Sequence, residues 1–85
     1  MPLTLRRDVT ATRVGDGLVL LDQRSGRYWQ LNATGTVVLR ALLDGSTLPE
    51  AAHELSRRSA VGIEQALADA TELLGHLHSA RLVTP

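Results

Sequence analysis

The stretch GRYWQLNATG, residues 26 to 35, marks the point where the chain changes from one kind of secondary structure to another. Its first half, Arg27 to Leu31, holds both aromatic residues of the chain and is typical of a strand. Asn32 then offers a side-chain cap for a helix, and the apolar residues after it follow helical spacing. The stretch therefore predicts a strand that leads directly into a helix, with Tyr28 and Trp29 pointing to opposite faces of that strand.

Two further strand segments precede this stretch. The segment Val9 to Val14 alternates between apolar and polar residues, and Gly15-Asp16-Gly17 is a turn signal. Leu18 to Leu21 is apolar at every position, which suits a central strand covered on both faces. Arg24-Ser25-Gly26 fits a short hairpin loop with glycine in the left-handed position. Consecutive hairpins predict a three-stranded antiparallel meander with its third strand at an edge.

Three helices are predicted after Asn32. The first runs to about Leu43 and ends at Asp44-Gly45. The second begins at the capping box Thr47-Leu48-Pro49-Glu50, with proline in its first turn, and runs to about Arg58. The third runs from Ile63 to about Ser79. The residues expected to face the core are Val38, Leu39, Leu42, Leu48, Ala51, Ala52, Leu55, Ile63, Ala66, Leu67, Ala70, Leu73, Leu74 and Leu77.

The fold class that follows is α+β: a three-stranded antiparallel meander followed by three helices that cover its apolar face, similar to a winged helix-turn-helix. Residues 1–85 form one domain. Gly75, inside the third helix, costs about 1 kcal/mol relative to alanine. Either another group packs closely against it or the cost is tolerated.

Composition narrows the classes of function. The 85 residues contain no cysteine, and nine arginines balance nine carboxylates. A neutral chain lacks the electrostatic footprint of a nucleic-acid or anionic-membrane binder. Neither a signal peptide nor an apolar run near ~18 residues is present, so we expect a soluble, cytoplasmic protein. A core this small supplies roughly 3–5 kcal/mol, which leaves room for stabilisation by a partner.

The sequence offers no group of residues that does chemistry by itself. His76 and His78 are two residues apart, which on a helix places them about 200° apart, so they do not converge on a metal ion. No nucleophile motif is present, and we expect no enzyme activity, no metal and no cofactor. The third helix carries Glu64, Asp69 and Glu72 but no Lys or Arg, which is unlike a helix that reads DNA.

The third strand is the candidate functional element. An edge strand exposes unpaired N–H and C=O groups, and Arg27 to Leu31 has neither the Lys nor the Pro that usually protects such an edge. In one interpretation Trp29 is simply part of the core and Tyr28 is an exposed strand former. In the other, the edge receives an extended peptide as an added strand, beside a groove formed with the third helix. The sequence leaves open whether Tyr28 and Gln30, or their neighbours, point their backbone groups outward.

The residues also resemble a known family. The run GLVLLDQRSGRYWQLNATGTVVLRALLDGSTLPEAAHEL and the ending LLGHLHSARLV are similar to the PqqD-like peptide chaperones, the precursor-recognition domains of ribosomally made, modified peptides. Within that family, the chain resembles the free-standing leader-binding proteins of lasso-peptide pathways in actinobacteria. The most specific part is a strand ending in Leu31-Asn32-x-x-Gly35, followed by an apolar helix and Asp44-Gly45.

The resemblance implies a site and partners. The leader of a precursor peptide adds to the third strand and lies against the third helix, and a separate leader peptidase and a macrolactam-forming synthetase then act on the peptide. The alternatives are a PqqD-like chaperone of another modified-peptide pathway, a winged-helix regulator and a dimer that pairs its own edge strands. The peptide-binding residues that the resemblance implies are Arg27, Tyr28, Trp29, Gln30, Leu31, Ala66, Asp69, Ala70, Leu73 and Leu77.

Overall fold

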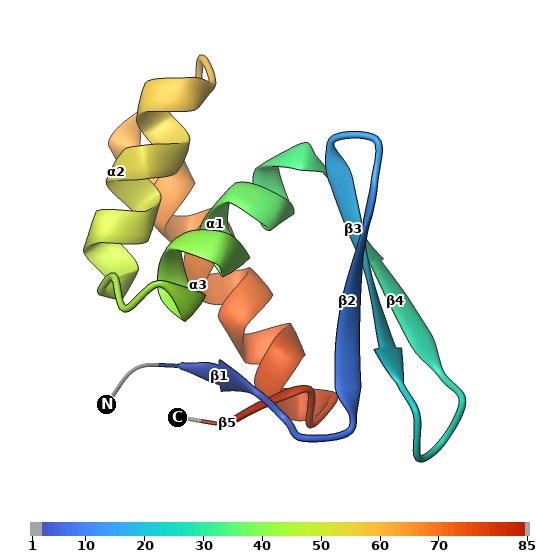
Figure 1. Ribbon diagram of the computed structural model, residues 1–85. Coiled ribbons are helices and arrows are strands. Elements are labelled where there is room, and N and C mark those ends of the chain that lie inside the picture. Colours follow the sequence, from blue (N-terminus) through green and yellow to red (C-terminus); the bar gives the residue numbers. More distant parts are fainter. Residues whose placement is uncertain (1–2, 85) are drawn as a thin grey trace.

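The computed structural model describes residues 3–84 and confirms the predicted α+β fold (Figure 1). Three antiparallel strands form a sheet in the order β2-β3-β4, and all three helices lie on one side of it. Helix α1 packs on β3 and β4, α2 packs against α1 and α3, and the C-terminal half of α3 lies beside the sheet. The elements are β1 (Thr4–Leu5), β2 (Val9–Val14), β3 (Gly17–Asp22), β4 (Tyr28–Leu31), α1 (Ala33–Leu43), α2 (Leu48–Arg58), α3 (Ile63–Ser79) and β5 (Val83–Thr84).

The helix ends lie where the sequence predicts them. The Asn32 side chain accepts a hydrogen bond from the Gly35 N–H at 2.9 Å and so caps α1. The capping box of α2 is complete, since Thr47 accepts from the Glu50 N–H at 3.2 Å and Glu50 accepts from the Thr47 N–H at 2.7 Å. Gly45, with φ of 99°, ends α1 in a conformation that side chains disfavour. Within residues 3–84, no helix is both long enough and apolar enough to cross a membrane.

A small second sheet, which the sequence analysis did not predict, joins the two ends of the described chain. Strands β1 and β5 pair antiparallel, with Thr4 opposite Thr84. Arg81 has a left-handed conformation (φ 58°) that turns the chain at the end of α3. This turn allows β5 to pair with β1. The Leu82 N–H then donates to the Leu77 carbonyl at 3.0 Å, and the Leu82 side chain is fully buried.

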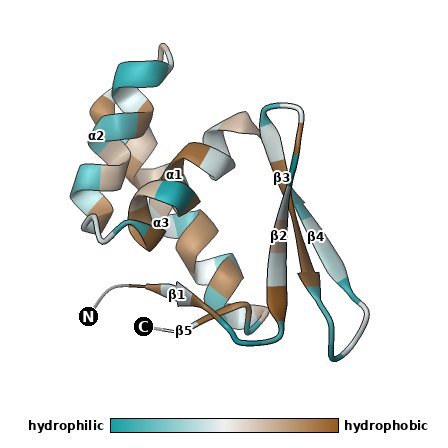
Figure 2. Cartoon of the chain, in the orientation of Figure 1, coloured by the Kyte–Doolittle hydropathy of each residue, from teal (hydrophilic) through white to brown (hydrophobic). Residues whose placement is uncertain are grey.

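The core consists of two clusters of buried side chains that meet at α1. Hydrophobic and hydrophilic residues alternate along the helices that supply it (Figure 2). The sheet–helix cluster lies between the inner face of the sheet, α1, α3 and the second sheet. The helical cluster lies among α1, α2 and α3. The sheet–helix cluster comprises Val9, Leu18, Leu20, Leu39, Leu77, Leu82 and Val83, and the helical cluster comprises Val38, Leu42, Ala51, Ala52, Leu55, Ala66 and Ala70.

Two expectations about burial are wrong. Strand β3 is covered on its inner face only, and Leu21 on the outer face is 37% exposed. The reason is that all three helices lie on the inner side of the sheet, which leaves none over the outer face. The long apolar stripe of α3 is also only partly covered. Its middle row is buried, whereas Ile63 and Leu67, along one edge of the stripe, are 41% and 39% exposed because α1 and α2 do not reach them.

Gly75 lies inside α3, where the low helix propensity of glycine costs stability that the fold tolerates. A Cβ built at Gly75 meets nothing within 4 Å, so no close packing requires glycine there. We expect Gly75→Ala to raise the free energy of unfolding by about 0.5–1 kcal/mol, the gain in helix propensity. Urea denaturation measures this, and a lower stability of the variant would contradict it. Gly17→Ala is the contrasting variant, because its Cβ would lie 2.5 Å from the Leu31 carbonyl oxygen, and it should destabilise.

Candidate functional site

The hairpin between β3 and β4 fixes the position of the edge strand. The Asp22 carboxylate accepts from the Arg24 N–H at 3.0 Å and from the Ser25 hydroxyl at 3.1 Å. Burial by itself raises the pKa of Asp22, but these two hydrogen bonds, together with the Ser25 backbone N–H and the charge of Arg6, hold the pKa below its ordinary value. Gly26 has the predicted left-handed conformation, with φ of 75°. The hairpin is therefore ordered by its own side chains, and it sets the register that pairs Leu20 with Trp29.

This register decides which backbone groups of β4 face outward. The Asp22 N–H donates to the Arg27 carbonyl at 2.9 Å, so these two residues form a hydrogen-bonded pair across the ladder. Bonded and non-bonded pairs alternate along antiparallel strands. Trp29 therefore bonds to β3, whereas Tyr28 and Gln30 point their N–H and C=O groups away from the sheet. The sequence alone left open which residues of this strand point their backbone groups outward.

A groove of about 700 Å³ lies beside this edge, between β4 and α3. Its apolar lining comes from β4, from α3 and from the segment after α3. Its polar lining includes Arg27 at one end, His76 on the helix and Asn32 at the other end. The Arg27 guanidinium lies 5.4 Å from the centre of the Trp29 ring, a cation–π contact that holds it along the groove wall. The apolar lining residues are Trp29, Leu31, Leu73, Leu77, Ala80 and Leu82.

The structure places the residues of the predicted site in four different environments. Those that line the groove are Arg27, Trp29, Gln30, Leu31, Leu73 and Leu77. Tyr28 lies on the outer face of the sheet and is 69% exposed. Ala66 and Ala70 are fully buried in the helical cluster, since α2 packs over their side of α3, and they present no surface to the groove. Asp69 lies in a neighbouring hollow of about 320 Å³.

Sequence reasoning missed part of the groove. His76, Ser79, Ala80 and Leu82 line it, and all four lie in the last turn of α3 or just after it. Leu82 was the detectable one, because it is a large apolar residue three positions after the predicted helix end at Ser79. The others are recognisable only once the turn at Arg81 brings this segment back toward β4.

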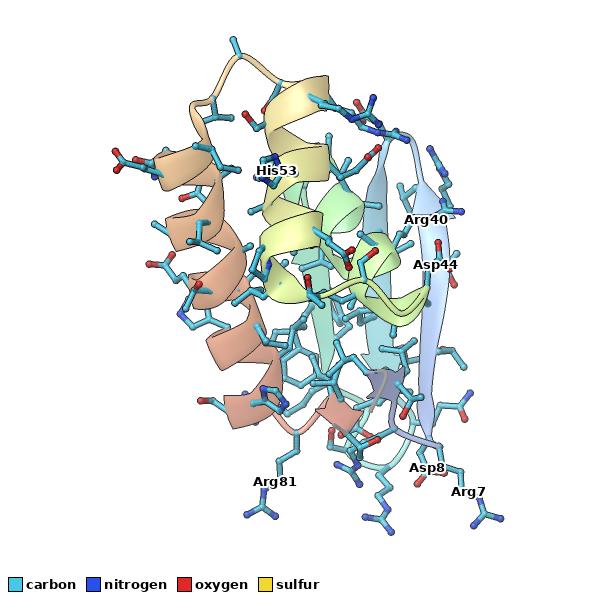
Figure 3. All side chains as sticks on the ribbon, turned by 90° about the vertical axis from the view of Figure 1, so that its left-hand side faces the viewer. Arg7, Asp8, Arg40, Asp44, His53 and Arg81 are labelled. Atoms are coloured by element: carbon cyan, nitrogen blue, oxygen red, sulfur yellow. The ribbon has the colours of Figure 1, made fainter. Side chains whose placement is uncertain are left out.

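The sheet has a second free edge, β2, and its surroundings differ. A basin of about 750 Å³ lies beside the turn end of β2, against α1 and α2. Charged side chains dominate its lining, among them Arg13, Arg40 and Asp44 (Figure 3). Of the two edges, only β4 adjoins a groove whose walls are mainly apolar, so β4 is the edge suited to anchor an extended peptide through its side chains.

No metal centre accompanies the groove. Among residues 3–84, no group of three or more His, Asp or Glu side chains is placed to hold a metal ion. His53 lies on α2 (labelled in Figure 3), whereas the other two histidines lie on α3. What the site offers is therefore an unpaired strand edge and an apolar groove with a charged rim, which together can bind an extended chain.

Comparisons with known proteins identify the family to which this chain belongs. The family model described as "Coenzyme PQQ synthesis protein D (PqqD)" matches residues 17–83. This chain belongs to the PqqD family of peptide-recognition domains, which are non-catalytic binding domains. A search of curated protein sequences returns no significant match.

Two solved structures are similar over the whole domain. The structure "Lasso peptide synthetase B1 complexed with the leader peptide" matches with a TM-score of 0.90 and 33% identity, covering 100% of both chains. The structure "TbiB1 in Complex with the TbiA(beta) Leader Peptide" matches with a TM-score of 0.83 and 22% identity, covering 94% of this chain and 93% of that one. The first likeness extends to the sequence, and the second shows a shared fold.

Proposed function

We propose that this protein binds the leader segment of a ribosomally made precursor peptide in lasso-peptide biosynthesis. The leader adds to β4 as a fourth strand, bonded to the outward backbone groups of Tyr28 and Gln30, and its alternate side chains enter the groove between β4 and α3. The observation that carries this proposal is the coincidence of an unpaired edge with an apolar groove. The relative that is 33% identical was solved with a leader peptide, which supports the same ligand class.

Magnitudes explain why both parts of the site are needed. Two outward residues offer four hydrogen bonds, at roughly 0.5–1.5 kcal/mol each, or about 6 kcal/mol at most. Ordering a flexible peptide offsets much of this gain. Micromolar binding needs about 8 kcal/mol net. Two or three apolar side chains of the leader, each contributing about 1.5–3 kcal/mol when buried, close the difference.

The role that follows is that of an adaptor. The protein holds the leader in an extended form and presents it to a separate leader peptidase, after which a macrolactam-forming synthetase closes the product. A complex of this kind forms in the cytoplasm, where the precursor peptide is made. Only the groove and the edge are committed to the leader, so the outer face of the sheet and the far surfaces of α2 stay accessible to these enzymes.

Trp29 provides the direct test of the proposal. It is the only tryptophan of the chain, and its ring lies in the groove. We expect the leader of the cognate precursor peptide to change Trp29 emission saturably. The melting temperature should rise in parallel, since a ligand at 100 times its Kd stabilises by about 2.7 kcal/mol.

A scrambled leader of the same composition is the control for this titration. Calorimetric binding of the leader without any change in Trp29 emission would place the peptide elsewhere on the protein. No heat and no change in emission with the authentic leader would contradict the proposed function. Sedimentation of the free protein tests the alternative that a second copy of the chain, and not a leader peptide, pairs along β4.

A further inference from the structure

The two ends of the β4–α3 groove carry opposite charge. Arg27 lines the groove at the start of β4, and no carboxylate belongs to the groove lining among the described residues. The neighbouring hollow shares Asn32, Leu73 and His76 with the groove and so continues it past the end of β4. That hollow is lined by the carboxylates of Asp69 and Glu72, and by no Arg or Lys of residues 3–84.

The contacts of these charged groups leave them available to a ligand. Arg27 forms no salt bridge within residues 3–84, and its guanidinium is held over Trp29. Asp69 accepts one hydrogen bond from the Gln65 amide at 2.8 Å, which leaves its charge in place. The N-terminus of α1, at Asn32, lies in the same hollow and carries a partial positive charge of about one half. Two carboxylates exceed that charge, so this end remains acidic.

The directions of β4 and α3 determine which way a bound peptide runs relative to the two charged ends. Strand β4 runs from the Arg27 end of the groove to the Asn32 end, and α3 runs the opposite way, from Asp69 toward Ala80. Antiparallel pairing is the more stable arrangement for an added strand and is the one that β4 already makes with β3. A peptide paired in this way has its N-terminal part at the acidic end of the groove and its C-terminal part at the basic end.

We propose that the charge polarity of the groove fixes the direction and register of the leader. The groove selects a segment in which a basic residue precedes an acidic one, with apolar residues between them. The basic side chain meets Asp69 and Glu72, and the acidic side chain meets Arg27. Arg27 and Asn32 are five positions apart, about 17 Å at strand spacing. Since side chains that face the groove recur at every second position, the two charged residues lie four or six positions apart.

The proposal rests on the proposed function, and a peptide selection tests the two separately. A displayed library of random 14-residue peptides is selected on the wild-type protein, and the binders are then tested on Gln30→Pro. We expect binders that require the β4 edge and that carry the basic-before-acidic order. Exchanging the two charged residues in a selected synthetic peptide should weaken its binding about tenfold, the effect of turning two exposed attractions into repulsions. The difference should shrink at high salt.

A charge-inverted protein supplies the reciprocal measurement. The variant Arg27→Glu with Asp69→Lys and Glu72→Lys should bind the exchanged peptide more tightly than the original one. Arg40→Glu is the matched control, because Arg40 lines the separate basin beside β2 and should leave the preference unchanged (Figure 3). Melting temperatures verify that each variant is folded.

The outcomes of these experiments distinguish the charge polarity of the groove from the peptide-binding function itself. Binders that depend on the β4 edge but show no charge order, or the opposite order, would overturn the polarity and leave the peptide-binding function standing. An inverted variant that keeps the wild-type preference would do the same. A selection that returns no binder, or only binders indifferent to Gln30→Pro, would overturn the proposed function and the polarity with it.

Discussion

We expect Gln30→Pro to abolish leader binding while the domain stays folded, and Trp29→Pro to unfold it. Proline lacks the N–H donor, and its ring occupies the place of the hydrogen. At Gln30 the lost N–H faces away from the sheet, a position where edge strands accept proline. At Trp29 the lost N–H bonds to β3, a position from which sheets exclude proline, and a domain this small has only about 3–5 kcal/mol of stability to lose.

Circular dichroism and leader titration by calorimetry measure the two variants side by side. Trp29→Phe is the control for the ring, since it keeps the backbone donor and most of the apolar surface. A Gln30→Pro variant that binds the leader with wild-type affinity would show that β4 is not the docking edge. A Trp29→Pro variant that stays folded would contradict the assignment of outward and inward backbone groups.

The second large effect concerns which face of the sheet holds the core. Leu20 and Leu21 are adjacent leucines of β3, but Leu20 is fully buried and Leu21 is 37% exposed. We expect Leu20→Ala to lower the free energy of unfolding by about 2–5 kcal/mol, through lost burial and the cavity left behind. Leu21→Ala should cost clearly less, because much of its side chain is already in water.

Urea denaturation of both variants measures the difference, and the leucine pair is its own matched control. Equal losses would mean that the outer face is covered in solution, for example by a second copy of the chain. Sedimentation at several concentrations would then detect that copy. A large loss for Leu20 alone supports a sheet with one open face.

The sequence predicted the helices well because their signals are local. Asn32, Thr47 and Gly45 each act through atoms within a few residues, so capping and left-handed termination can be read directly from the chain. The edge position of β4 followed from consecutive hairpins in the same way. The part of the groove contributed by Trp29 and Leu73 followed from placing strand and helix side by side.

The remainder depended on contacts between distant residues. The pairing of β1 with β5 joins two-residue strands, which are too short to show a period. The exposure of Ile63 depends on how far α2 reaches along α3, which no spacing within α3 reveals. Ala66 and Ala70 share the helix with Leu73, and only the position of α2 decides that they face the helical cluster instead of the groove.

The junction of β1 with β5 has a consequence for synthesis of the protein on the ribosome. The hydroxyls of Thr4 and Thr84 lie 2.7 Å apart although the residues are 80 positions apart in the sequence. Leu82 and Val83, which belong to the sheet–helix cluster, are translated after every other member of it. The nascent chain therefore cannot complete this core until Leu82 and Val83 have been made and have left the ribosome. Strand β1 stays unpaired until β5 has been made, and the peptide groove, with Leu82 in its lining, forms only after translation has passed that point.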